Sequence, residues 1–280
     1  MAVQISNAFV TLFDSEVKQA YQGQRLLTGV TRERTNVEGS TVKFPKIGKG
    51  TATIRVPQTD VTPLNVSYSQ VTATMEDYIA AEYSDIFNQQ KVNFNERQEL
   101  VQVVSGAIGR RMDQVILDAL AAGSTSNTVS NDIGGTDSNL NVAKLREAKR
   151  LLDQDNVPMD GRAILVHANS LTALLGETEV TSSDFNSVRA LVTGELNTFL
   201  GFRFITFGDR DEGGLPVDGS SDRTLYAFHR DAVGMAIGMN MSTRVDYIAE
   251  KTSFLVASMF SAGSVLIDGE GLVKLTCRES

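Results

Sequence analysis

Two histidines have the widest chemical range of any residues in this chain. His167 and His229 each follow an apolar run that is expected to form a strand, and α/β enzymes often carry catalytic groups at strand ends. A histidine placed there can act as a general acid, a general base or a metal ligand. Two histidines offer few groups for such chemistry. No serine lies in a Gly-x-Ser-x-Gly motif, which would mark a catalytic nucleophile. We interpret both as polar residues that close strands, and we predict no catalytic residue.

Two short segments partly match ligand-binding motifs. Gly48 to Thr51 resembles the end of a phosphate-binding loop, but glycine follows the lysine where serine or threonine is needed, and position 43 is a lysine instead of the first glycine. Asp209 to Gly214 resembles the start of a calcium loop, but its twelfth position is Ser220, where a bidentate glutamate is needed. We therefore predict no cofactor site and no metal site, and we interpret 209–214 as an acidic turn.

Three carboxylates, Asp153, Asp155 and Asp160, cluster around an expected turn. Their nearest companions in the sequence are Arg150 and Arg162, so a solvated or salt-bridged corner explains them without catalysis. The chain has no tryptophan and 7% aromatic residues, which does not suit a stacking platform for single-stranded nucleic acid.

The composition is that of an ordinary globular protein. The chain has 280 residues, of which 41% are hydrophobic, enough for a core without metals or disulfides. Its net charge is −8, with 34 acidic against 26 basic residues, and it has no Lys/Arg-rich run, so we do not expect sequence-specific DNA binding. The charge is compatible with containing DNA, because a wall facing packed duplex gains nothing from adhering tightly to it.

The single cysteine, Cys277, excludes an internal disulfide and fits a protein made in a reducing cytoplasm. We predict that it is a small buried hydrophobe near the last strand. Residues 1–13 lack the basic start of a signal peptide, and every apolar run is far shorter than the ~20 residues that a bilayer needs. We therefore expect neither a signal peptide nor a membrane span.

A long amphipathic helix is predicted over about 95–122. Apolar residues recur three or four positions apart between Leu100 and Ala119. Asn95 and Gln98 suggest a capping box at the start, and Gly123 suggests the end. At 1.5 Å per residue the helix would be roughly 40 Å long, so we expect it to be a spine.

The segments before this helix are an apolar-periodic start, a polar stretch and a set of alternating runs. The apolar residues of 5–17 have helical spacing. Residues 24–38 are polar and have no period, so we interpret this stretch as an arm lying over another surface, such as another subunit. Alternating runs at 41–44, 51–56 and 66–73 predict strands. Because an isolated hairpin is marginal in water, we expect this one to lean on something else.

After the spine helix the pattern alternates between helices and strands, which indicates an α/β or α+β core, and we predict an α+β fold for the whole chain. The expected helices cover about 142–156 and 170–175, and the expected strands cover 163–166, 202–205 and 225–228. Further strands are expected at 244–248, 254–256, 264–267 and 272–275, with an element at 253–263 that could be a helix.

Taken in order, these elements resemble the Hong Kong 97 capsid fold of tailed-phage coat proteins. Val157 to Val166, followed by a small helix ending at Leu174-Leu175, is similar to the family's stretch between the first axial-domain helix and the central strand. Gly194 to Leu196 and then Phe199 to Ile205 are similar to the segment in which these proteins place a glycine-aromatic pair before a strand. The resemblance covers nearly the whole chain.

The resemblance implies five parts. They are an N-terminal arm (1–35), an extended β-hairpin loop (36–75), a peripheral domain with the spine helix (76–137), an α/β axial domain (138–240) and returning strands that complete the peripheral domain (241–280). It further implies a major capsid protein, not an enzyme, whose hexamers and pentamers form the icosahedral head of a virion around double-stranded DNA. Each arm and loop would lie across a neighbour, and assembly would take place in the bacterial host cytoplasm.

The implied partners are other copies of the chain, a portal and a decoration protein. The region before the hairpin is short, so a separate scaffolding protein is expected rather than a built-in domain. Two alternatives stay open. A cellular nanocompartment shell with the same fold would enclose cargo enzymes, and an α/β hydrolase-like enzyme would be built around His167 or His229 with nearby aspartates.

Overall fold

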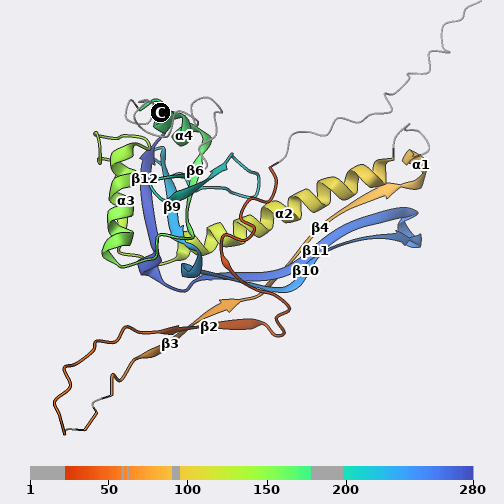
Figure 1. Ribbon diagram of the computed structural model, residues 1–280. Coiled ribbons are helices and arrows are strands. Elements are labelled where there is room, and N and C mark those ends of the chain that lie inside the picture. The colour runs from red at the N-terminus through yellow and green to blue at the C-terminus, as the bar shows by residue number, and fades with distance from the viewer. Residues whose placement is uncertain (1–22, 59, 62, 90–94, 178–197, 280) are drawn as a thin grey trace, which may run out of the picture.

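The computed structural model describes residues 23–58, 60–61, 63–89, 95–177 and 198–279. It is a mixed α+β fold, as predicted. Figure 1 shows a compact six-stranded sheet with helices α3 and α4 at one end of the molecule, and an elongated sheet that runs beside helix α2 toward the other end. A third, two-stranded sheet projects away from both.

Helix α2 (Glu96–Ala122) confirms the predicted spine helix. Its buried apolar side chains recur about once per turn and include Val104, Ile108, Met112, Ile116 and Leu120. The predicted capping box is wrong, because the Asn95 side chain makes no capping hydrogen bond. Gly123 does end the helix, in an extended conformation, with its N–H donating to Ala119 O.

The elongated sheet lies against α2. Its strand order is β1 (Arg32–Arg34), β10 (Val233–Ile248), β11 (Ser253–Leu266) and β4 (Glu76–Asp85), with only β1 parallel to its neighbour. Tyr78 of β4 stacks on Phe260 of β11 with 4.9 Å between ring centroids, and the Arg111 guanidinium of α2 lies over Tyr78. Helix α1 (Ile86–Gln89) follows β4, and the 3-10 turn η2 (Ala249–Lys251) precedes β11.

Two parts of this sheet differ from the sequence expectations. The stretch 253–263, which by its sequence could be a helix, belongs to strand β11. Its small residues, such as Ala257, Ser258 and Ser261, carry little periodic signal, and pairing with two long strands decides its conformation. Strand β4 was not predicted at all, because four of its ten residues are acidic and hide the alternation.

The compact sheet has the strand order β5 (Thr128–Val129), β12 (Leu272–Arg278), β9 (Asp222–His229), β6 (Arg162–His167), β8 (Phe202–Phe207) and β7 (Thr198–Phe199). Strand β6 is buried along its whole length and pairs in parallel with β8. Helix α4 (Ala168–Leu175) follows β6 directly, and α3 (Val142–Gln154) contacts β12 and β5. These elements confirm the predicted helices and strands of this region.

Strand β12 belongs to the compact sheet, where it pairs with β9. The resemblance places 241–280 among returning strands that complete the peripheral domain, and β12 is the strand of this range that lies outside the sheet beside α2. Leu272, Val273, Leu275 and Cys277 are buried, as suits a strand in a sheet interior. The predicted boundary at 240 also falls inside β10, so it does not coincide with a change of sheet.

The chain crosses between the two large sheets three times, and we call these three segments together the crossing. They are residues 124–127, the 3-10 turn η1 (Arg230–Ala232) and the 3-10 turn η3 (Gly269–Gly271). Thr125 Oγ1 lies 2.8 Å from the carbonyl oxygens of both Gly269 and Leu272. The Ile267 N–H donates to Ala232 O over 2.7 Å. The three segments are therefore fastened to one another.

The projecting sheet is a hairpin of β2 (Thr41–Ile47) and β3 (Tyr68–Thr74). Its root packs on its own chain through a small apolar cluster of Val42, Phe44, Ala73, Ala236 and Ile267. Gly234 lets Phe44 approach closely, because a Cβ atom there would lie 2.9 Å from the ring. The expectation that the hairpin leans on something is thus confirmed for its root. Residues 51–56, expected as a strand, form none.

The described part of the arm also packs on its own chain. Leu27 is fully buried and Val30 is 5% exposed, while β1 adds to the edge of β10. The arm is expected to lie over another surface, and for residues 26–34 that surface belongs to the same chain. Residues 1–22, including the helical spacing at 5–17, lie outside the described residues.

Candidate assembly surfaces

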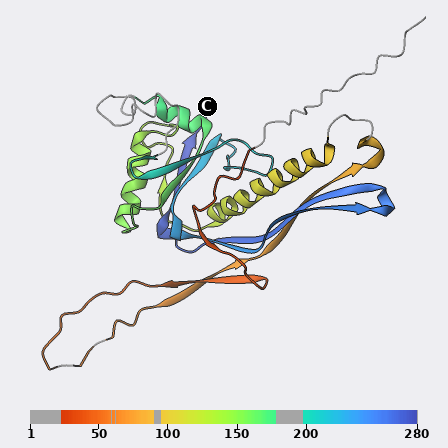
Figure 2. The ribbon, with the colours of Figure 1, turned by 45° about the vertical axis from the view of Figure 1, so that its right-hand side comes forward.

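The distal part of the hairpin exposes large apolar side chains. The exposed fractions are 95% for Ile54, 88% for Val61 and 80% for Tyr68, and Ile47, Val56 and Leu64 are each more than half exposed. Both views show this part of the hairpin extending away from the two large sheets (Figures 1 and 2). Such a concentration of exposed apolar residues on one projection is typical of a surface that another protein covers.

Two ion pairs fix the root of the hairpin to the crossing. Lys46 Nζ lies 2.7 Å from Asp268 Oδ1, and Lys49 Nζ lies 2.6 Å from Glu270 Oε2. The hydrogen bond to Glu270 raises the pKa of Lys49. The lysine of the segment that resembled a phosphate-binding loop is thus an anchor for the hairpin, and we call these two pairs the root ion pairs.

Asp113 joins three parts of the molecule at one buried carboxylate. Its side chain is fully buried in α2 and accepts the N–H groups of Leu26 and Leu27 at 2.8 and 3.0 Å. Arg210, which follows β8, donates to the same carboxylate at 2.9 Å and also to Gln24 O. The arm and the compact sheet are therefore both tied to the middle of the spine helix, and we call this contact the Asp113 joint.

The acidic turn at 209–214 makes further contacts with α2. Glu212 accepts from Arg110 Nε at 2.7 Å, and Gly214 N–H donates to Gln114 Oε1 at 2.8 Å. The stretch 209–214 forms a turn, as predicted, and arginines pair with two of its carboxylates, Arg223 with Asp209 and Arg110 with Glu212. Within the described part of the chain, no group of three or more His, Cys, Asp and Glu side chains is placed to hold a metal ion.

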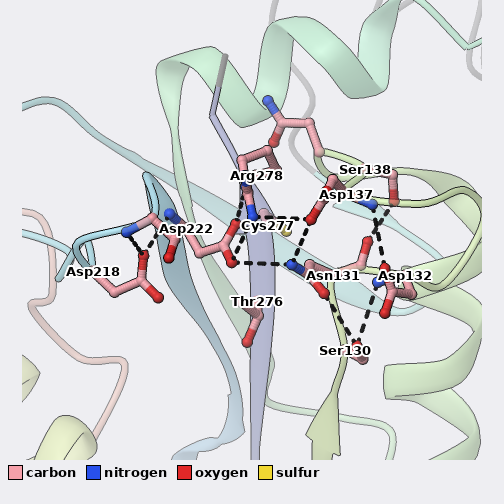
Figure 3. Close-up of polar contacts among 12 residues, drawn as sticks. Ser130, Asn131, Asp132, Asp137, Ser138, Asp218, Asp222, Thr276, Cys277 and Arg278 are labelled. Atoms are coloured by element: carbon pink, nitrogen blue, oxygen red, sulfur yellow. Dashed lines mark hydrogen bonds and ion pairs between the residues drawn. The ribbon is translucent and has the colours of Figure 1, made fainter.

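A polar network fastens the loop after β5 to the compact sheet (Figure 3). Asp222, at the start of β9, accepts from Arg278 Nε and from Asn131 Nδ2. Arg278 also donates to Asp137 at 2.9 Å. The loop 130–139 is therefore held at the end of the sheet by charge-assisted hydrogen bonds. Sequence inspection missed this network, because its members are spread over 148 positions and share no motif.

A buried lysine lies beside this network. Lys144 Nζ donates to Ser138 O at 2.6 Å and to Thr276 O at 3.0 Å, 4.0 Å from Cys277 Sγ. Burial lowers the pKa of Lys144 and raises the pKa of Cys277 to about 11. The prediction that Cys277 is a buried hydrophobe near the last strand is confirmed, because it is fully buried in β12.

Both histidines close strands, as predicted. His167 ends β6 and His229 ends β9, and each Nδ1 accepts the backbone N–H two residues later, at 3.4 and 3.2 Å. His229 Nε2 donates to Asp160 O at 2.8 Å. His167 lies 2.9 Å from Glu279 and 3.5 Å from Asp209, so the structure does bring one aspartate to it. Each ring is at most 9% exposed and holds the turn that follows its strand.

The carboxylate corner is partly as expected. Asp153 pairs with Arg162 at 2.7 Å, whereas Arg150 pairs with Glu147 instead of the corner. Asp155 accepts from Asn127 Nδ2 at 2.6 Å. The corner is therefore a structural contact between α3 and the start of β6.

The fold is similar to solved capsid structures. The head structure of Helicobacter pylori bacteriophage KHP40 matches with a TM-score of 0.79 at 12% identity, over 99% of this chain and 98% of that one. The capsid of the cyanophage P-SCSP1u matches with a TM-score of 0.78 at 15% identity, over 98% of this chain and 94% of that one. The structure of Mycobacterium phage Che8 matches with a TM-score of 0.74 at 16% identity, over 96% of this chain and 97% of that one. At these identities the likeness shows the fold alone.

The remaining comparisons concern sequence. No curated protein sequence matches the chain, and no helix among the described residues combines the length and apolarity needed to cross a bilayer. A family model described as phage capsid protein matches residues 5–279. The chain therefore belongs to the phage capsid protein family, as a structural component of the virion shell.

Proposed function

We propose that the chain is the major capsid protein of a tailed phage, and that its hexamers and pentamers build an icosahedral head around double-stranded DNA. The observation that carries this proposal is the hairpin, whose distal apolar side chains are left uncovered by the rest of the described chain. A second copy is the natural cover, because a shell supplies a neighbour to every subunit. Many modest contacts of this kind add up over a closed shell.

The proposed arrangement is of the Hong Kong 97 type. Residues 1–35 are the arm and 36–75 the extended loop. The peripheral domain comprises α2 with β4, β10 and β11, and the axial domain is the compact sheet with α3 and α4. Strand β12 belongs to the axial domain in this division, because it pairs with β9.

The proposed partners besides other copies are a separate scaffolding protein, a portal and a decoration protein, with assembly in the host cytoplasm. DNA is enclosed without sequence-specific contacts, in keeping with a net charge of −8. Co-expression with a candidate scaffold tests the first of these partners.

The hairpin can be tested by placing charge on its apolar side chains. We expect Ile54→Asp with Val61→Asp to abolish closed particles, seen by sedimentation and negative-stain electron microscopy, because each carboxylate would be buried against a neighbour without a partner. The same chain should unfold at an unchanged urea concentration, since both positions are at least 88% exposed.

Thr51→Asp with Thr53→Asp is the matched control, since it adds the same charge to the same exposed segment without removing an apolar group. Normal particles from the Ile54/Val61 variant would contradict the proposal. Particles that hold cargo protein and no DNA after production in infected cells would favour a nanocompartment.

A further inference from the structure

A pocket of about 330 Å³ lies at the outer edge of the compact sheet. Its walls are the arm at Gly29 and Val30, the turn and first residues of β6 at 159–163, and the β7–β8 turn. Among the described residues, β7 is the last strand of its sheet, so the pocket lies at a sheet edge that no further described strand covers.

The pocket is rich in arginine. Arg162, Arg203 and Arg230 line it together with one carboxylate, Asp160. The Arg162 guanidinium is already used, since it donates to Pro158 O and Val157 O and pairs with Asp153. Arg203 and Arg230 are exposed, and neither guanidinium group has a hydrogen-bond or ion-pair partner among the described residues. Two guanidinium groups are therefore available to a ligand.

The rim of the pocket is open because glycine occupies one position in each of three turns that border it. Gly29, Gly161 and Gly201 have φ values of +73°, +81° and +87°. No atom lies within 4 Å of where a Cβ atom would stand at Gly29 or Gly201. Leu200 and Gly201 both have positive φ, as in the tight hairpin turns that join paired strands. Among the described residues, no side chain fills the space beside Gly29 and Gly201 through which a side chain from outside would reach the arginines.

The chemistry of the pocket fits a carboxylate. A guanidinium binds a carboxylate with two parallel hydrogen bonds, and its charge does not titrate in the physiological range. A duplex backbone is a poorer fit, because proteins that bind it usually present many clustered cations, and the sequence has a net charge of −8 and no Lys/Arg-rich run. Copies of a chain with a net charge of −8 repel one another unless a cationic site on one meets an acidic site on the next.

We propose that Arg203 and Arg230 bind an acidic side chain of a second copy of this chain, which makes the pocket a contact site between subunits. This inference rests on the proposed function, since it assumes that copies assemble. Besides the apolar contact of the hairpin, the pocket would supply a polar contact that fixes the orientation of the two subunits.

The first test uses citrate as a carboxylate probe on the full chain below its assembly concentration. Calorimetry at constant ionic strength should show one saturable site, lost in Arg203→Gln with Arg230→Gln. Lys149→Gln with Arg244→Gln is the control, because it removes the same charge outside the pocket. Failure of the wild type to bind citrate, or equal binding by both variants, would overturn the pocket as an anion site, whether or not particles form.

The second test follows assembly by light scattering. The Arg203/Arg230 variant should need an about tenfold or higher protein concentration for half-assembly. Citrate at constant ionic strength should slow the wild type and the control but not this variant. If the variant binds no citrate yet assembles like the wild type, the second copy is not the ligand. Displacement of citrate by a short DNA duplex would assign the pocket to nucleic acid instead.

Discussion

Asp113 shows how much one side chain can hold together. Its buried carboxylate accepts two backbone N–H groups from the arm and a guanidinium from the segment after β8. A buried charge is tolerated only when it is paired and hydrogen-bonded, and here both conditions are met by residues 87 and 97 positions away. The arm and the compact sheet thus depend on the same group.

The Asp113 joint gives a clear stability prediction. We expect Asp113→Ala to lower the free energy of unfolding by about 3–5 kcal/mol, because it leaves the nearly buried Arg210 without its partner. Urea unfolding measures this loss. Asp118→Asn, on the same helix but with a side chain that is 54% exposed, should cost less than about 1 kcal/mol. Equal effects of the two changes would refute the role given to the joint.

The buried Cys277 thiol is expected to make the free energy of unfolding fall at alkaline pH. Burial raises its pKa from 9.0 to about 11. Between these values the unfolded chain has released the thiol proton and the folded chain has kept it, so the unfolded state binds fewer protons and stability falls as pH rises. From pH 9 to 11 the wild type should lose about 1–3 kcal/mol more than Cys277→Ala in urea unfolding. Parallel losses in the two proteins would exclude this linkage.

At the scale of elements, periodic segments were predictable and weakly periodic ones were not. Helix α2 and the buried strand β6 have strong patterns, and both were found close to their predicted bounds. Strand β4 was missed because its acidic residues break the alternation, and β11 was ambiguous because its small residues fit either period. The sheet that β12 joins depends on its pairing with β9, a strand about 50 residues earlier, and no local sequence pattern encodes that pairing.

Of the candidate surfaces and contacts, the hairpin was predictable from the sequence and the Asp113 joint was not. The hairpin was expected from its alternating runs, and its distal part is the one whose apolar side chains are left exposed. The Asp113 joint was missed, although a lone aspartate between Met112 and Val115 on the apolar stripe of a helix was a signal. Its partners could not be identified, because contacts across about 90 positions follow from packing and not from spacing.

The root ion pairs should set the direction of the hairpin more than the stability of the fold. Exposed pairs contribute little, so Lys46→Ala with Lys49→Ala should change the free energy of unfolding by less than about 1 kcal/mol. Distances between spin labels at positions 53 and 149 should nevertheless spread more widely than in the wild type. Lys43→Ala, at an exposed position of the same strand, is the control. An unchanged distance distribution would show that the apolar root alone orients the hairpin.

At the scale of the whole molecule, the chain combines two well-packed bodies with one segment that has little support of its own. Residues 49–66 take part in no strand of the described structure, and the nearest backbone pair is Gly48 N–H to Ser67 O at 2.8 Å. The compact sheet contains fully buried strands, such as β6. The two regions should therefore differ widely in local stability.

Hydrogen exchange tests this difference. In the unassembled chain, backbone amides of 49–66 should exchange near the unprotected rate, and those of β6 should be the most protected. In closed particles, the hairpin amides should slow by at least about tenfold while β6 changes little. Fast exchange of the hairpin in particles would mean that no neighbour covers it.

The crossing has a consequence for how the molecule can deform. Segments 124–127 and η3 are hydrogen-bonded through Thr125, and η1 is hydrogen-bonded to Ile267 just before η3, so the described connections between the two sheets lie close together. A change in the angle between the sheets would therefore be concentrated at the crossing. The Asp113 joint and the apolar core, which contains residues of both sheets, would keep that change small. A small change of this kind would let identical subunits occupy positions of unequal curvature while the strand pairing within each sheet is kept.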